Sequence, residues 1–116
     1  MRHLTSGRTL SRTSDQRRAL IRTLAHHLIS RGSITTSEAK AKTLRPAMER
    51  LVTIARSGTP AARRELARRL PEATAAKLVR EIAPRMSNRS GGYTRITKLG
   101  PRRSDASRRA MIEFVA

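Results

Sequence analysis

Apolar residues in the first third of the chain recur with the spacing of one helical face. Five of them follow an i, i+3, i+4, i+7, i+8 pattern, which predicts an amphipathic helix. Ser14 is a suitable N-cap with Asp15 in the first turn, and Gly32 is a suitable stop. The five apolar positions are Ile21, Leu24, Ala25, Leu28 and Ile29.

A second stripe of apolar residues predicts another helix that ends near Arg56. Thr35 and Glu38 have capping-box spacing, and Thr36 is a competing N-cap. Pro46 lies inside the stripe and removes a backbone donor, so we expect a kink or a break there. The stripe consists of Leu44, Ala47, Met48, Leu51, Val52 and Ala55.

Two shorter helices are expected to follow Gly58. Thr59 and Pro60 form an N-cap followed by proline at the first helical position, and Pro71 is a natural end of that helix. A fourth helix is predicted over about 73–83, with Pro84 as its end. The residues expected to face inward from these two helices are Leu66, Leu70, Leu78, Val79 and Ile82.

The last third of the chain changes to strand-like patterns after a loop at 87–92. Segments 93–99 and 108–115 predict two antiparallel strands, and a short segment around Ile34 is a candidate for a third. We therefore predict an α+β fold of about four helices packed on a small two- to three-stranded mixed sheet. It would form a single domain over 14–116, preceded by an extended basic N-terminal arm at 1–13.

The net charge of the chain says more about its function than any single motif does. The 116 residues include 26 Lys and Arg against 8 Asp and Glu, a formal net charge of +18. Self-repulsion at this level favours a polyanionic partner. Most of the basic residues are arginines, whose planar guanidinium groups bind phosphate bidentately and stack on bases. The composition therefore predicts a nucleic-acid-binding protein.

Several basic or glycine-rich segments are candidates for contact with RNA, each beside a plainer alternative. Lys40, Lys42 and Arg45 could share one broad face of the second helix, or that face could simply be solvated. The glycine pair at 91–92 could let a backbone approach a phosphate, or form an ordinary turn. Tyr93 could stack on a base or belong to the core. The remaining candidates are Arg12, Arg17, Arg18, Arg95, Lys98, Arg102 and Arg103.

Other chemistry finds little support in the sequence. There is no cysteine, no apolar run long enough to span a membrane, and no signal-like N-terminus. Ser37 and Lys40 have a serine–lysine spacing without its companion motifs, and the adjacent His26 and His27 diverge on a helix. We therefore expect no enzyme activity, cofactor, metal, membrane partner or small-molecule substrate, and a cytoplasmic location.

Taken together, ordered blocks along the whole chain resemble the bacterial large-subunit ribosomal protein seventeen family. The blocks are Met1-Arg2-His3-Leu4, Ser6-Gly7-Arg8, Thr35-Thr36, Lys40-Ala41-Lys42, Leu44-Arg45, Gly91-Gly92-Tyr93-Thr94-Arg95-Ile96, Lys98-Leu99-Gly100-Pro101-Arg102-Arg103 and Met111-Ile112-Glu113-Phe114-Val115. The resemblance implies a structural role in the large ribosomal subunit near the exit of the peptide tunnel, in contact with large-subunit rRNA and neighbouring ribosomal proteins.

The resemblance also implies which residues contact the rRNA. It implies this role for the 40–42 segment and the 91–95 turn, and for an N-terminal arm that reaches into rRNA. The arm residues are Arg2, His3, Ser6, Gly7, Arg8 and Arg12. The leading alternative is a basic DNA-coating nucleoid protein, which would carry the same charge but normally adds a dimer, a repeat or a groove-reading element. A membrane-surface polypeptide is a weaker alternative, because the apolar stripes predict a shared core.

Overall fold

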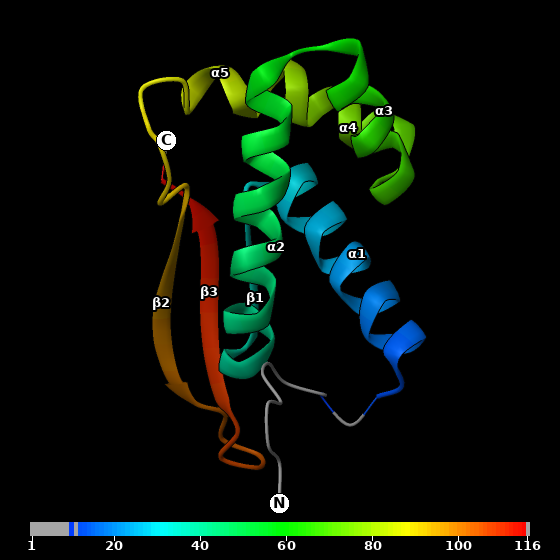
Figure 1. Ribbon diagram of the computed structural model, residues 1–116. Helices are drawn as coiled ribbons and strands as arrows, with labels where there is room; N and C mark the ends of the chain where they lie inside the picture. The colour runs from blue at the N-terminus through cyan, green and yellow to red at the C-terminus, as the bar shows by residue number, and fades with distance from the viewer. Residues whose placement is uncertain (1–9, 11, 116) are drawn as a thin grey trace, which may run out of the picture.

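The computed structural model describes Leu10 and residues 12–115, and shows helices packed against a three-stranded sheet (Figure 1). The sheet has strand order β1-β3-β2. Helix α2 lies against the sheet, and α1 packs beside α2. The predicted α+β class, the helices and the third strand are confirmed.

Helix α1 spans Ser14–Arg31, and its N-cap is Thr13, one residue earlier than predicted. The Thr13 hydroxyl accepts from the Gln16 amide at 3.3 Å, and the Gln16 side chain accepts from the Thr13 amide at 3.1 Å. This reciprocal pair makes Thr13 a better cap than Ser14, because it satisfies two backbone donors. Gly32 ends the helix with a φ of +84°, as expected of a C-terminal glycine.

Strand β1 (Ser33–Ser37) runs directly into helix α2 (Glu38–Ser57). Ser37 is the N-cap and accepts from the Lys40 amide at 3.3 Å, so the predicted caps at Thr35 and Thr36 are wrong. Those two residues are in β1 and pair with β3 instead. Pro46 does not break α2, because the apolar stripe buries Leu44 and Met48, at 0% exposure, on either side of it.

Helix α3 (Pro60–Arg69) begins at the Thr59 cap as predicted. The next helical segment runs continuously through α4 (Glu72–Lys77), the π-helical turn η1 (Leu78–Ile82) and α5 (Ala83–Arg85). Pro84 therefore does not end it, contrary to the prediction. The amide of Ala83 donates to the Leu78 carbonyl in the wider π-turn, and this widening accommodates the proline ring just after it.

Strands β2 (Thr94–Pro101) and β3 (Arg108–Phe114) pair antiparallel, and β1 pairs antiparallel with the other side of β3. All strand pairs are thus antiparallel, and the predicted mixed sheet is wrong in this respect. Ile34 and Ile96 both lie opposite Ile112, which is fully buried under the helices. Ile96 and Phe114 are half-buried at the edge of the same core.

Among the fully buried core residues, one side chain is aromatic. Tyr93 is the largest fully buried side chain, with 1% of its surface exposed. Its burial beside α2 fixes where the 87–93 loop joins β2. None of the helices within the described residues is both long and apolar enough to cross a membrane. The other fully buried large side chains are Leu28, Ile29, Leu44, Met48, Val52, Leu66, Leu78, Met86 and Ile112.

Candidate nucleic-acid interface

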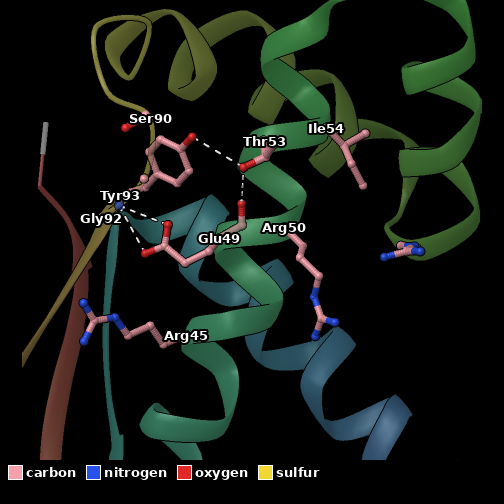
Figure 2. Close-up of a pocket in the computed structure, with 10 residues that line it drawn as sticks. Arg45, Glu49, Arg50, Thr53, Ile54, Ser90, Gly92 and Tyr93 are labelled. Atoms are coloured by element: carbon pink, nitrogen blue, oxygen red, sulfur yellow. Dashed lines mark hydrogen bonds between the residues drawn. The ribbon is translucent and has the colours of Figure 1, made fainter.

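A groove of about 580 Å³ lies between α2 and the loop at 87–93 (Figure 2). The outer face of α2 forms one wall of the groove. The end of α3 and the loop with the glycine pair form the rest of its lining. Arginines from two helices line the groove together with small and polar groups. The lining residues are Arg45, Glu49, Arg50, Thr53, Ile54, Arg69, Ser90, Gly91, Gly92 and Tyr93.

Glu49 joins the loop to α2 through its carboxylate. Both carboxylate oxygens accept from the Tyr93 amide at 3.1 Å, as Figure 2 shows. One oxygen also accepts from the Thr94 amide at 3.4 Å and from the Thr94 hydroxyl at 3.2 Å. Burial at the start of β2 removes these backbone amides from water, and the carboxylate supplies the hydrogen-bond acceptor that they would otherwise lack.

Arg56 makes a second connection, about two helical turns further along α2. Its Nη1 donates to the Tyr93 hydroxyl at 2.7 Å, and its Nη2 donates to the Ser87 carbonyl at 3.1 Å. The guanidinium carbon also lies 5.7 Å from the centre of the Tyr93 ring. The roles of Glu49 and Arg56 could not be predicted from the sequence, because their partners are more than thirty residues away in the chain.

Two arginines on the α2 wall are available to a ligand. Arg45 and Arg50 are exposed, and within the described part of the chain neither has a hydrogen-bond or ion-pair partner. Arg69 comes from α3 and forms an ion pair of 2.8 Å with Glu65 on the same helix. Arg45 was predicted as a contact residue from the sequence, but Arg50 and Arg69 were not, because only the packing of α3 on α2 brings them to one groove.

The glycine pair lines the same groove from the loop, on the side of α2 toward which Arg45 extends, whereas Arg50 extends from the other side of the helix (Figure 2). Gly92 has a φ of +65°, a left-handed conformation that a glycine adopts without strain. The amides of Ser90, Gly91 and Gly92 donate to no other described residue, and all three residues are exposed. Successive free N–H groups of this kind form concavities that bind anions.

Tyr93 itself is not available for stacking. Its ring is in the core and its hydroxyl is held by Arg56, so the core alternative is the correct one. The structure therefore removes the Tyr93 ring from the candidates for base stacking. Its backbone amide, held by Glu49, still positions the glycine pair beside it.

A second basic cluster forms where the start of α2 meets β2. Glu38 pairs with Lys42 at 2.8 Å and lies 3.7 Å from Lys98. The hydrogen bond from Lys42 is the main cause that lowers the pKa of Glu38, with charge contributions from Lys42, Lys98 and Arg108. Lys40 is not part of the cluster. Residues two positions apart in an α-helix are separated by about 200° around its axis. Lys40 and Lys42 therefore do not share one face of α2, contrary to the prediction.

The turn at 102–107 between β2 and β3 forms a third basic site. The Arg102 guanidinium donates to the Ser107 hydroxyl at 3.0 and 3.1 Å and lies 3.4 Å from Asp105. Asp105 accepts from the Ser107 hydroxyl at 2.7 Å and from its amide at 3.1 Å, and these bonds lower the Asp105 pKa. Arg102 thus supports the turn, while Arg103 is exposed at its tip.

The remaining candidates are spread over other elements. Arg95 forms an ion pair of 2.8 Å with Glu113, its cross-strand neighbour. Arg17 donates to the Arg12 carbonyl at 2.8 Å, and Arg18 pairs with Asp15 at 3.1 Å. Arg12 in turn donates to the Leu10 carbonyl at 2.9 Å. The candidates Arg2, His3, Ser6, Gly7 and Arg8 lie outside the described residues.

Titratable side chains that could support catalysis do not gather in the described structure. His26 is hydrogen-bonded to the hydroxyl of Thr74, which is buried. No group of three or more potential metal ligands occurs within residues 12–115. The arrangement therefore offers cationic surfaces and backbone donors for an anionic ligand.

Comparisons with known proteins agree with the resemblance. The family model described as ribosomal protein L17 matches residues 20–115. A protein of Gemmatimonas aurantiaca named large ribosomal subunit protein bL17 is 50% identical, over 99% of this chain and 98% of its own length. Relatives with the same name from Sphingopyxis alaskensis and a Hydrogenobaculum species are 51% and 50% identical over 99% of this chain, covering 84% and 99% of their own lengths. The chain therefore belongs to the ribosomal protein L17 family.

Proposed function

We propose that this protein is a structural constituent of the bacterial large ribosomal subunit that binds and stabilises large-subunit rRNA near the exit of the peptide tunnel. The observation that carries the proposal is the match along nearly the whole chain to relatives named as large-subunit proteins. Its family is structural, and the protein is not an enzyme. Its partners are large-subunit rRNA and neighbouring ribosomal proteins, and it acts in the ribosome, in the cytoplasm.

The charge of the chain supplies the physical basis for binding. Each arginine or lysine that meets a phosphate releases condensed counterions, which drives association and makes it depend on salt. Exposed cations occur along α2, in the 102–107 turn and on the outer side of β2. We propose that the exposed Arg45, Lys98 and Arg103 contact phosphates from these elements, and that the half-buried Lys40 does so from the first turn of α2.

Several of the basic residues form ion pairs with an acidic neighbour, and these pairs can hold their side chains in place for RNA binding. Lys42, Arg95 and Arg102 lie within 4 Å of Glu38, Glu113 and Asp105. These pairs fix where the side chains lie before RNA arrives, which reduces the entropy lost on binding. Residues 1–13 are proposed to form an RNA-binding arm separate from the domain at 14–116.

A-form RNA hides the base edges of its deep major groove, so the protein is expected to recognise shape, junctions and unpaired segments. A DNA-coating protein with the same charge would favour duplex DNA instead. The distinction can be measured by competition between large-subunit rRNA and duplex DNA of equal nucleotide concentration, at low and raised salt.

The proposal predicts that rRNA remains bound to the protein in the presence of an equal nucleotide concentration of duplex DNA at both salt concentrations. Displacement of rRNA by duplex DNA would contradict it and favour the DNA-coating alternative.

A further inference from the structure

The groove between α2 and the 87–93 loop collects positive charge from segments far apart in the sequence. Arg45 and Arg50 extend from α2, as Figure 2 shows, and Arg69 approaches from α3. The one acid among the lining residues is Glu49. Its two oxygens already accept hydrogen bonds from the amides of Tyr93 and Thr94. The groove is therefore cationic in net charge, and its carboxylate is engaged with the loop.

Backbone donors lie along the loop edge of the groove. The amides of Ser90, Gly91 and Gly92 are free of acceptors among the described residues and follow one another along the chain. Gly91 does not have a positive φ, and a Cβ built on it would meet nothing within 4 Å. The fold itself thus does not require a glycine at 91, and the open space leaves its backbone accessible to a ligand atom. Guanidinium groups and free backbone amides both bind phosphate, and both kinds of group line this groove.

The groove is open to solvent and has room for a ligand the size of one nucleotide. Its volume of about 580 Å³ falls within the roughly 300–1,000 Å³ of small-ligand sites. Ile54 and the methyl group of Thr53 add apolar surface to the α2 wall. A base-paired segment presents its phosphates on a broad convex surface, whereas an unpaired nucleotide can place base, sugar and phosphate in a concave site.

We propose that this groove binds a single unpaired nucleotide of RNA, with its phosphate near Arg45 and the Ser90–Gly92 amides and the adjoining backbone phosphate near Arg50 and Arg69. The inference deepens the proposed function and rests on it. Arg50 and Arg69 are the two contact residues that it adds. Glu49 is a positioning residue, because it holds the loop amides in place without itself meeting the phosphate.

The first test uses the absence of cysteine from the chain, which allows one unique thiol to be introduced. Asn88→Cys places a tether for iron-EDTA on the exposed loop, beside the groove but outside its lining. Ser104→Cys places the same tether on the turn at the opposite end of the sheet (Figure 1). Tagged copies are incorporated into large subunits in cells, the subunits are purified, and the tethered iron then cleaves nearby rRNA by hydroxyl radicals.

The expected result is cleavage from Asn88→Cys that centres on an unpaired nucleotide, with a different pattern from Ser104→Cys. Cleavage centred on both strands of a continuous duplex, or none from Asn88→Cys while Ser104→Cys cleaves, would overturn the inference and leave the proposed function intact. Failure of both variants and of the unmodified chain to enter large subunits would instead contradict the proposed function.

The second test measures affinity for the rRNA fragment that the cleavage identifies. Arg50→Ala with Arg69→Ala removes two groove cations, and Gly91→Leu fills the open space at the loop. Each is expected to weaken binding about tenfold, the change that corresponds to about 1.4 kcal/mol. The matched control is Arg63→Ala with Arg64→Ala, which removes two exposed cations from α3 outside this groove.

The control is expected to weaken binding less than threefold, on the order of a non-specific charge effect. Equal losses for the control and the groove variants would mean that only total charge matters, and would overturn the inference. Circular dichroism of each variant confirms that the fold is retained, which the exposure of all the substituted residues predicts.

Discussion

The two loops at opposite ends of the sheet are both held by a carboxylate, but in different ways (Figure 1). The 87–93 loop is fixed by Glu49, which belongs to α2 and lies 44 residues before its partner Tyr93. The 102–107 turn is fixed by Asp105, which accepts hydrogen bonds from Ser107 only two residues later. One loop therefore depends on tertiary packing, and the other is organised by its own sequence.

The surroundings of the two carboxylates differ as much as their origins. Glu49 and the amides it accepts from are partly shielded from solvent beside the buried Tyr93 ring, whereas Asp105 is exposed. Hydrogen bonds that replace lost hydration contribute more to stability than those in full contact with water. Glu49 should thus stabilise the whole domain, while Asp105 should order only its own turn.

The largest effect is expected from Glu49→Ala. It leaves the amides of Tyr93 and Thr94 without their acceptor, so the free energy of unfolding should fall by about 2–3 kcal/mol. Urea denaturation followed by circular dichroism measures this. The matched control, Glu65→Ala, removes an acid whose partners are exposed arginines, and should cost less than about 1 kcal/mol. Equal losses for the two variants would contradict the difference drawn between the loops.

A smaller effect is expected from Tyr93→Phe. The ring stays in the core, but the hydroxyl that accepts from Arg56 at 2.7 Å is lost. The free energy of unfolding should fall by about 1 kcal/mol, the usual contribution of one such hydrogen bond. Arg56→Ala combined with Tyr93→Phe should then cost less than the sum of the single changes, because they share one interaction. Strict additivity in the same urea experiment would show that the bond contributes nothing.

The smallest effect is expected from acid acting on the 102–107 turn. The Ser107 bonds lower the pKa of Asp105, so the charged form orders the turn above the ordinary carboxyl pKa of about 4. That ordering is lost as the pH falls through the lower pKa of the folded state. NMR titration should show the Ser107 amide shifting with a midpoint below that of an ordinary aspartate. A midpoint at or above the ordinary value would mean that the bonds do not form.

The features of the fold that could be predicted from the sequence are local ones, and those that could not depend on tertiary contacts. The apolar stripes located four helical segments, and the Gly32 and Thr59 signals marked helix boundaries within a residue, since each acts over one turn. Ser37 displaced the expected caps because Thr35 and Thr36 pair with β3. Pro84 stayed within a helix because the π-turn before it accommodates the ring.

The candidate site was predictable only in part, for the same reason. Arg45 and the glycine pair could be singled out by charge and composition, and they do line one groove. Arg50, Arg69 and Glu49 could not, because their association depends on how α3 and the 87–93 loop pack on α2. Spacing along the chain also does not distinguish a supporting arginine such as Arg56 from an available one such as Arg50.

Stoichiometric membership of the large ribosomal subunit can be measured by sedimentation of a tagged copy from cell lysate through a sucrose gradient, at low and moderately raised salt. We expect one copy per large subunit at both salt concentrations and no protein in DNA-containing fractions. Release into the free pool, or recovery with the nucleoid, would contradict this expectation.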